Sequence, residues 1–195
     1  MCGHLLCPID EDWNNEETRQ KLKDGRIIVQ PEDLPSFLWQ GCSRDKEDIF
    51  DGFLKHELLI KTYLHIFRGP SHATGAGKSA RKGNALIHGI SKTSLESVAY
   101  CACILRHILS SQTTFTSGAG RNGDFQSKRF YQTLLDVMYS MEEDDQMELM
   151  RWWNDKIFAG LEEEAEDSSR TGKISVAAQM KARAREKRAA GQTGQ

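Results

Sequence analysis

Two short stretches of this sequence are similar to motifs that carry chemistry, and each departs from its motif at a position that the chemistry needs. Gly75–Ser79, which contains Lys78, has the composition of a phosphate-binding loop. That motif needs an earlier glycine at position 72, where this chain has a histidine, and a preceding strand, which is not predicted here. We therefore interpret the stretch as a flexible basic loop.

The second stretch begins with His56-Glu57, like the metal-binding helix of zinc proteases. A second histidine one turn later would let two imidazoles face one metal ion, but that position is Ile60. The zinc motif is therefore incomplete. We expect His56 and Glu57 to be surface residues beside an apolar stripe.

The cysteines do not form a ligand set either. Cys101 and Cys103 would point about 200° apart on a helix, so we expect both to be buried as small apolar residues. Cys2, His4 and Cys7 lack a fourth ligand placed by spacing. Three further histidines have no carboxylate or nucleophile at a recognisable spacing and are expected to be structural: His65, His88 and His107. We predict no metal, no cofactor and no catalytic residue.

Cysteine usage and hydropathy indicate the compartment. Five cysteines, an odd number without regular spacing, favour a reducing compartment over a disulfide framework. Residues 1–25 lack a cationic start followed by an apolar stretch, so no secretory signal is predicted. The longest nearly apolar stretch, 98–109, is interrupted by Arg106 and His107 and is too short to cross a bilayer. We expect a soluble intracellular protein of the nucleus or cytoplasm, with no membrane contact.

The elements that must position these residues are predicted to be helices. Apolar residues recur at three- and four-residue spacings from Phe50 to Phe67, and Gly69–Pro70 ends that helix. A second helix is predicted to run to Leu109. It begins at Thr93-Ser94-Leu95-Glu96, which fits a capping box with Thr93 as the cap and Glu96 reaching back.

Two more helices follow in the sequence. One starts near Phe125, and the spacing Ser140-x-x-Glu143 indicates a break and a new helix with its own capping box. This last helix ends before Gly160. Its apolar face is expected to hold four residues: Met147, Met150, Trp153 and Ile157. Adjacent helical residues diverge by about 100°, so Trp152 is expected at the margin of the core.

These patterns predict an all-α fold, an irregular bundle of about four to five helices with disordered N- and C-terminal tails. Residues 1–30 are expected to be a flexible acidic segment with few apolar anchors. Residues 31–160 form the predicted helical domain. Residues 161–195 form an acidic and then basic tail that is disordered or partly helical.

The near-zero charge of the whole chain hides two opposite blocks. The formal net charge is −2, with 26 Lys and Arg against 28 Asp and Glu. Residues 170–188 carry seven cations and one carboxylate, a net +6. The remaining residues carry 19 cations and 27 carboxylates, a net −8. The tail is therefore the strongest candidate for contact with a polyanion.

The densest part of the basic tail offers five contact residues: Lys181, Arg183, Arg185, Lys187 and Arg188. Such a helix-permissive run spreads cations along phosphates or an acidic protein surface, and it also fits a nuclear-import signal. It contains no aromatic residue for base stacking, so sequence-specific single-strand binding is not supported. The plain alternative is a solvated tail, partly neutralised by its own acidic run.

Patches through the middle of the chain resemble an uncharacterised family of intracellular proteins found mainly in mushroom-forming fungi. The longest patch is residues 53–71 (FLKHELLIKTYLHIFRGPS). Shorter patches are Lys82-Gly83-Asn84, Ile87-His88-Gly89, Ser97-Val98-Ala99-Tyr100, Arg129-Phe130-Tyr131 and Trp152-Trp153-Asn154. The resemblance covers about residues 34–158 and implies a shared helical domain. It implies no reaction, cofactor or catalytic residue.

The polar positions in or near these patches are where a site is expected if one exists: Lys82, Asn84, His88, Arg106, Arg129, Tyr131 and Asn154. The preferred hypothesis is a non-enzymatic helical interaction module whose basic tail contacts nucleic acid or an acidic protein. One alternative is an enzyme of unknown class with a polar pocket around His88 and Arg129. Another is a homo-oligomeric scaffold assembled through Trp152, beside Arg151.

Overall fold

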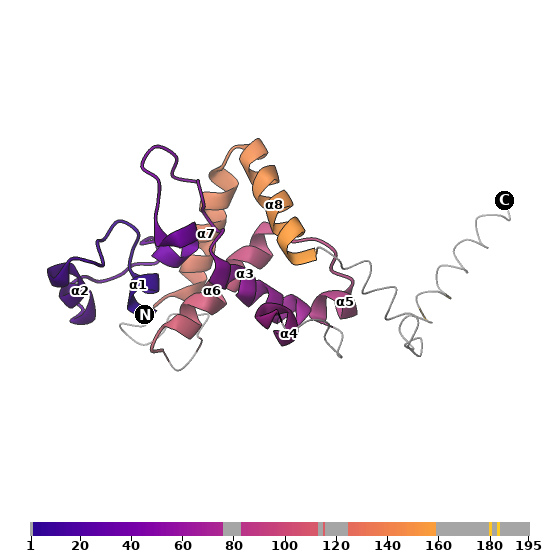
Figure 1. The fold of residues 1–195 in the computed structure, drawn as a ribbon, viewed down its shortest axis with the longest axis horizontal. Helices are drawn as coiled ribbons and strands as arrows, with labels where there is room; N and C mark the ends of the chain where they lie inside the picture. Colours follow the sequence, from indigo (N-terminus) through magenta and orange to yellow (C-terminus); the bar gives the residue numbers. More distant parts are fainter. Residues whose placement is uncertain are drawn as a thin grey trace. The chain divides into compact units, whose positions relative to one another are not determined.

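The computed structural model describes residues 2–75, 83–112, 115 and 125–158, together with residues 180 and 183 (Figure 1). The chain divides into two units, Met1–Ala159 and Gly160–Gln195. Within the described residues the secondary structure is helical, without a strand, and five α-helices have seven or more residues. The all-α prediction is therefore confirmed. No helix in these ranges combines the length and apolarity needed to cross a membrane.

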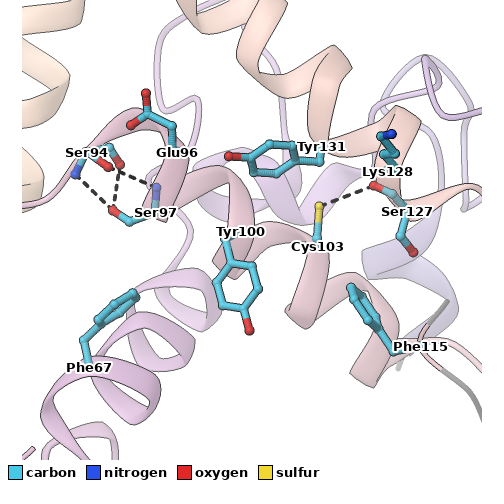
Figure 2. Close-up of a pocket in the computed structure, with 10 residues that line it drawn as sticks. All are labelled: Phe67, Ser94, Glu96, Ser97, Tyr100, Cys103, Phe115, Ser127, Lys128 and Tyr131. Carbon is cyan, nitrogen blue, oxygen red and sulfur yellow. Dashed lines mark hydrogen bonds between the residues drawn. The ribbon is translucent and has the colours of Figure 1, made fainter. Parts of the chain in front are cut away.

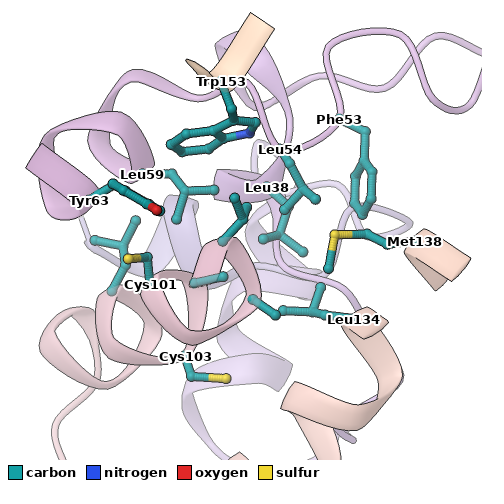
Figure 3. Packing of buried hydrophobic residues seen from close by; sticks show 14 of the residues in the cluster. Leu38, Phe53, Leu54, Leu59, Tyr63, Cys101, Cys103, Leu134, Met138 and Trp153 are labelled. Atoms are coloured by element: carbon teal, nitrogen blue, oxygen red, sulfur yellow. The ribbon is translucent and has the colours of Figure 1, made fainter. Parts of the chain in front are cut away.

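The core of the first unit lies around α6 (Leu95–Leu109), which packs between two neighbours. On one side lies α3 (Glu57–Tyr63), and on the other α7 (Ser127–Ser140). Helix α8 (Glu143–Phe158) adds Trp153, whose ring centroid is 5.3 Å from that of Tyr63 on α3 (Figure 3). Both side chains are fully buried. Packing against these neighbours buries most of the run from Val98 to Leu105, while Tyr100 lies on the side of α6 that stays exposed.

The first long predicted helix starts later than its apolar pattern indicates. Instead of beginning at Phe50, α3 begins after His56, whose imidazole accepts a hydrogen bond from the Leu58 amide at 3.1 Å. An antiparallel bridge joins Trp39 to Phe53, and Leu54 adopts a left-handed conformation with φ 57°. These contacts hold residues 50–54 in turns. The surface position predicted for His56 is also wrong, because its side chain is 8% exposed.

The predicted end of that helix is confirmed. A π-helix, Leu64–Arg68, continues α3 and stops at Gly69, which has φ 106°. Only glycine adopts such a backbone conformation without strain. Pro70 then occupies the first position of a short helix, α4 (Pro70–Thr74), where its missing N–H costs nothing.

The start of α6 is capped one residue later than predicted. Ser94, rather than Thr93, is the cap: its hydroxyl accepts from the Ser97 amide at 3.2 Å, and the Ser97 hydroxyl accepts from the Ser94 amide at 3.0 Å. Glu96 is not the partner that completes the capping box: its carboxylate accepts a 2.6 Å hydrogen bond from the Tyr139 hydroxyl on α7, and it also interacts with the Ser94 side chain. Two short serine hydroxyls therefore form the capping box.

The break between α7 and α8 is confirmed, although Ser140 does not cap α8. Ser140 is the last residue of α7, and its hydroxyl donates to the Val137 carbonyl at 2.7 Å. The predicted apolar face of α8 is wrong at Met147, which is 52% exposed, whereas Leu149 is buried. Trp153 and Ile157 are buried as predicted.

The N-terminal residues, expected to be flexible, have anchors in the structure. Helix α1 (Cys2–Leu6) is followed by Cys7, which is 3% exposed. The Ser36 hydroxyl donates to the His4 carbonyl at 2.6 Å, and the Ile9 amide donates to the Leu34 carbonyl at 2.9 Å. These contacts join residues 4–9 to residues 34–36. The remaining short helices are α2 (Glu16–Lys23), α5 (Asn84–His88) and the 3₁₀ turns Ser36–Leu38 and Gln40–Cys42.

Candidate functional site

A pocket of about 550 Å³ lies along α6 where it meets the first turn of α7 (Figure 2). Its lining consists of aromatic rings, four small residues and two charged side chains. These are Phe67, Tyr100, Phe115 and Tyr131; Ser94, Ser97, Cys103 and Ser127; and Glu96 and Lys128. A volume in this range and a mainly apolar wall with a few polar groups are typical of small-molecule sites.

The aromatic walls come from separate parts of the chain. Tyr100 projects from the side of α6 away from the core and is 45% exposed. Phe115, 42% exposed, lies edge-on against the His107 ring with centroids 5.3 Å apart. Phe67 and Tyr131 are half-buried. Burial raises the pKa of the Tyr131 hydroxyl, and the Glu96 carboxylate raises it further, so this hydroxyl stays protonated at neutral pH.

A carboxylate and an ammonium occupy opposite ends of the pocket, with the rings between them (Figure 2). The hydrogen bond from Tyr139 is the main cause that lowers the pKa of Glu96, which is ionised at neutral pH. At the other end, Lys128 is exposed, and no carboxylate among the described residues pairs with it.

The first turn of α7 adds positive potential beside Lys128. The turn contains no acidic residue, and the side chain of its N-cap residue, Gln126, makes no capping hydrogen bond. The first amides of a helix have no intrahelical acceptor, and the helix dipole places partial positive charge there. This end of the pocket therefore favours an anion.

Arg106 lies on α6 next to the same turn, within the core. Its side chain is 9% exposed, and its guanidinium carbon lies 3.0 Å from the centroid of the Phe125 ring and 5.8 Å from that of Phe130. Burial lowers the pKa of Arg106 to about 10, so the group stays charged at neutral pH. The contacts are those of a cation–π stack that holds the residues before α7.

Two of the other polar residues singled out from the sequence have structural partners, and a third is exposed. The Asn84 amide donates to the Ile66 carbonyl at 2.8 Å. Arg129 donates to the Glu32 carboxylate at 2.6 Å. His88 is exposed at the end of α5.

Asn154 accepts hydrogen bonds from Thr93, which directly precedes the cap of α6. Of the predicted set, Tyr131 lines the pocket along α6 and α7, while Lys82 lies outside the described residues. No described contact joins His88 to Arg129, and a polar pocket around them stays a prediction.

Most residues of the basic tail and of the phosphate-loop-like stretch also lie outside the described residues. Of the five tail positions, Arg183 is described, as an exposed residue, and Lys181, Arg185, Lys187 and Arg188 are not. Of residues 75–79, only Gly75 is described, as the left-handed residue that ends α4.

One thiol–imidazole pair was not anticipated from the sequence. The Cys42 sulfur lies 3.4 Å from His56 Nε2. Because His56 Nδ1 accepts from the Leu58 amide, the ring hydrogen sits on Nε2 and points at sulfur. Burial raises the pKa of the Cys42 thiol and lowers that of His56, so both groups are neutral at pH 7. The pair caps a helix rather than activating a nucleophile.

The described residues contain no set of side chains arranged to bind a metal ion. His4, Cys7 and Cys42 line a smaller pocket of about 120 Å³, but no group of three or more His, Cys, Asp or Glu side chains there is arranged to hold an ion. Cys101 and Cys103 are buried as predicted, and burial raises the pKa of the Cys103 thiol to about 12.

The fold and pocket define a small helical domain without an assembled metal or nucleophile site among the described residues. Residues 1–158 match a family of unknown function, DUF6698, and the chain belongs to that family. The match extends to the N-terminal helix α1, which packs against α6. Comparison with curated proteins and with solved structures finds no match.

Proposed function

We propose that this protein is a non-enzymatic helical interaction module of the nucleus or cytoplasm, whose basic C-terminal segment contacts nucleic acid. The observation that carries the proposal is the net charge of +6 between residues 170 and 188, on a chain whose other residues carry −8. Lysine and arginine neutralise phosphates and release counterions, which drives binding at low and moderate salt.

Composition favours phosphate contacts over base recognition. The segment has no aromatic side chain to stack on bases, and its cations alternate with alanines from Lys181 to Arg185. Binding is therefore expected to be independent of sequence and steeply dependent on salt. An acidic protein surface offers similar charges and is the alternative partner class.

The test is a salt titration of fluorescent double-stranded DNA and single-stranded RNA on the full chain. A variant with Lys181, Arg183, Arg185, Lys187 and Arg188 changed to Gln is the comparison. The plot of log affinity against log salt for duplex DNA should become shallower by up to about 4–5 units, since each phosphate contact contributes about 0.9.

A matched control changes five cations of the first unit to Gln: Lys23, Lys46, Lys61, Lys92 and Lys156. This control should keep the slope of the unsubstituted chain. An equal decrease of the salt-dependence slope in both variants would show that the tail does not contact the nucleic acid. If the chain binds poly-glutamate but no nucleic acid, the partner of the tail is an acidic protein surface instead.

A further inference from the structure

The pocket between α6 and α7 is a feature that the proposed nucleic-acid contact does not use. Four aromatic rings, Phe67, Tyr100, Phe115 and Tyr131, face one volume of about 550 Å³ (Figure 2). Two of them are more than two-fifths exposed although they lie beside a well-packed core. Clustered exposed aromatic surface of this kind marks a binding site more often than scattered single residues do.

The charges at the pocket fix the direction in which an occupant lies. Lys128 and the first turn of α7, whose N-cap side chain makes no capping hydrogen bond, attract an anion at one end. Glu96 repels an anion at the other end, and its own charge is already stabilised by the Tyr139 hydroxyl. An occupant with one anionic group therefore places that group at Lys128 and its apolar part among the rings.

The polar groups of the lining argue against a peptide. Each peptide residue brings an N–H and a C=O that need partners when buried. The Ser94 and Ser97 hydroxyls are already engaged in the cap of α6, and the Ser127 carbonyl already accepts from the Cys103 thiol at 3.8 Å. Flat aromatic walls with few free hydrogen-bonding groups fit a ring-containing small molecule better.

We infer that this pocket binds a small molecule with an aromatic or alicyclic ring body and a single carboxylate, sulfonate or similar anionic group. The rings of Tyr100 and Tyr131 contact its body, and the Lys128 ammonium binds its anion. None of the lining residues belongs to the basic tail, so the inference stands or falls independently of the proposed nucleic-acid contact.

Two fluorescent probes with nearly the same rings test the inference on the full chain. The first, 1-anilinonaphthalene-8-sulfonate, carries a sulfonate, and the second, N-phenyl-1-naphthylamine, does not. We expect saturable binding of the sulfonate probe with one site per chain, and binding about tenfold weaker for the neutral probe, which lacks the charge-assisted contact.

Three variants locate the site. Lys128→Gln should weaken the sulfonate probe about tenfold and leave the neutral probe unchanged. Tyr100→Ala should weaken both probes, because it removes a ring wall. Lys46→Gln, an exposed cation in a loop outside the pocket lining, is the matched control and should change neither. Near-ultraviolet circular dichroism on each variant checks that its fold is intact.

Three results would overturn the inference. One is an absence of saturable binding of either probe to the folded chain. Another is equal weakening by Lys128→Gln and Lys46→Gln, which would reduce the effect to bulk charge. Light scattering that shows a dimer, with Tyr100→Ala making it monomeric, would also overturn it and assign the rings to a second copy of this chain.

Discussion

The side-chain oxygen of Asn154 accepts two hydrogen bonds from Thr93, one from the backbone amide at 2.7 Å and one from the hydroxyl at 2.9 Å. Asn154 lies on α8, and Thr93 comes just before the cap of α6, 61 residues earlier. Thr93 is 5% exposed, so water does not replace these bonds easily. This contact ties the start of α6 to α8.

Removing the acceptor should destabilise the fold. Asn154→Ala leaves the Thr93 amide and hydroxyl without their partner, and the free energy of unfolding should fall by about 1–3 kcal/mol. Asn154→Asp keeps an oxygen at the same position and is the matched control, with a smaller loss. Urea denaturation followed by tryptophan fluorescence measures both. Equal losses would mean that the acceptor oxygen does not matter.

The two adjacent tryptophans should differ in their effects on stability. Trp153 is fully buried against Tyr63, and Trp153→Ala should lower the free energy of unfolding by about 3–5 kcal/mol. Trp152 is half-buried, with the Lys55 and Lys156 ammonium groups 5.8 and 5.7 Å from its ring. Trp152→Ala should lower the free energy of unfolding by about 1–2 kcal/mol, because it removes the cation–π contacts and a partly buried ring.

Thermal unfolding of the two variants in parallel separates these effects, and a larger loss for Trp152→Ala would contradict the burial pattern. The same samples test the scaffold alternative. A concentration-dependent mass in light scattering that disappears with Trp152→Ala would support assembly through Trp152. A monomer at high concentration would count against it.

The buried cysteines should make stability fall at alkaline pH. Burial raises the pKa of Cys103 to about 12 and that of Cys7 to about 11, from 9.0. The folded state therefore keeps protons that the unfolded chain releases. This contribution is complete below about pH 8 and declines as pH rises through 9 toward 12. Arg106, with its pKa lowered to about 10, acts in the opposite direction above pH 10.

Urea denaturation from pH 7 to pH 10, with a reducing agent present, should show this decline before the arginine contributes. Cys103→Ala should make the decline shallower. Alkylation with iodoacetamide at pH 8 gives a second check, because exposed Cys2 should react while Cys101 and Cys103 react only on unfolding. Rapid native alkylation of Cys103 would contradict its burial.

His56 should make stability fall at acidic pH. Burial lowers its pKa below 6.5, although the Glu57 carboxylate opposes the shift and Lys61 adds to it. The unfolded chain therefore binds a proton that the folded state resists, and the contribution is lost as pH falls from about 6.5 toward the folded-state pKa. Protonation would also remove the Nδ1 acceptor that caps α3.

His56→Asn isolates this contribution, since asparagine caps helices and does not titrate. The dependence of unfolding free energy on pH between 5 and 7 should become flatter in the variant. His88→Asn is the matched control, because His88 is exposed. If the pH dependence is unchanged in His56→Asn, another group causes the loss of stability at acidic pH.

Sequence alone determined the features that depend on neighbouring residues. Spacing and local backbone chemistry predict the helical class, the end of a helix at Gly69–Pro70 and the break after Ser140. They also predict that Trp153 is buried in the core while Trp152 lies at its margin. These signals lie within one or two helical turns. A single sequence carries them in full.

Tertiary structure decided the features that depend on distant partners. The bridge between Trp39 and Phe53 delays the start of α3, and Asn154 engages Thr93 so that Ser94 caps α6. The aromatic pocket likewise joins Phe67, Tyr100, Phe115 and Tyr131, which no common spacing connects. Packing free energy is shared over the whole core and selects among local alternatives that differ by about 1 kcal/mol. For that reason the cap register and the pocket emerge only when the helices are brought together.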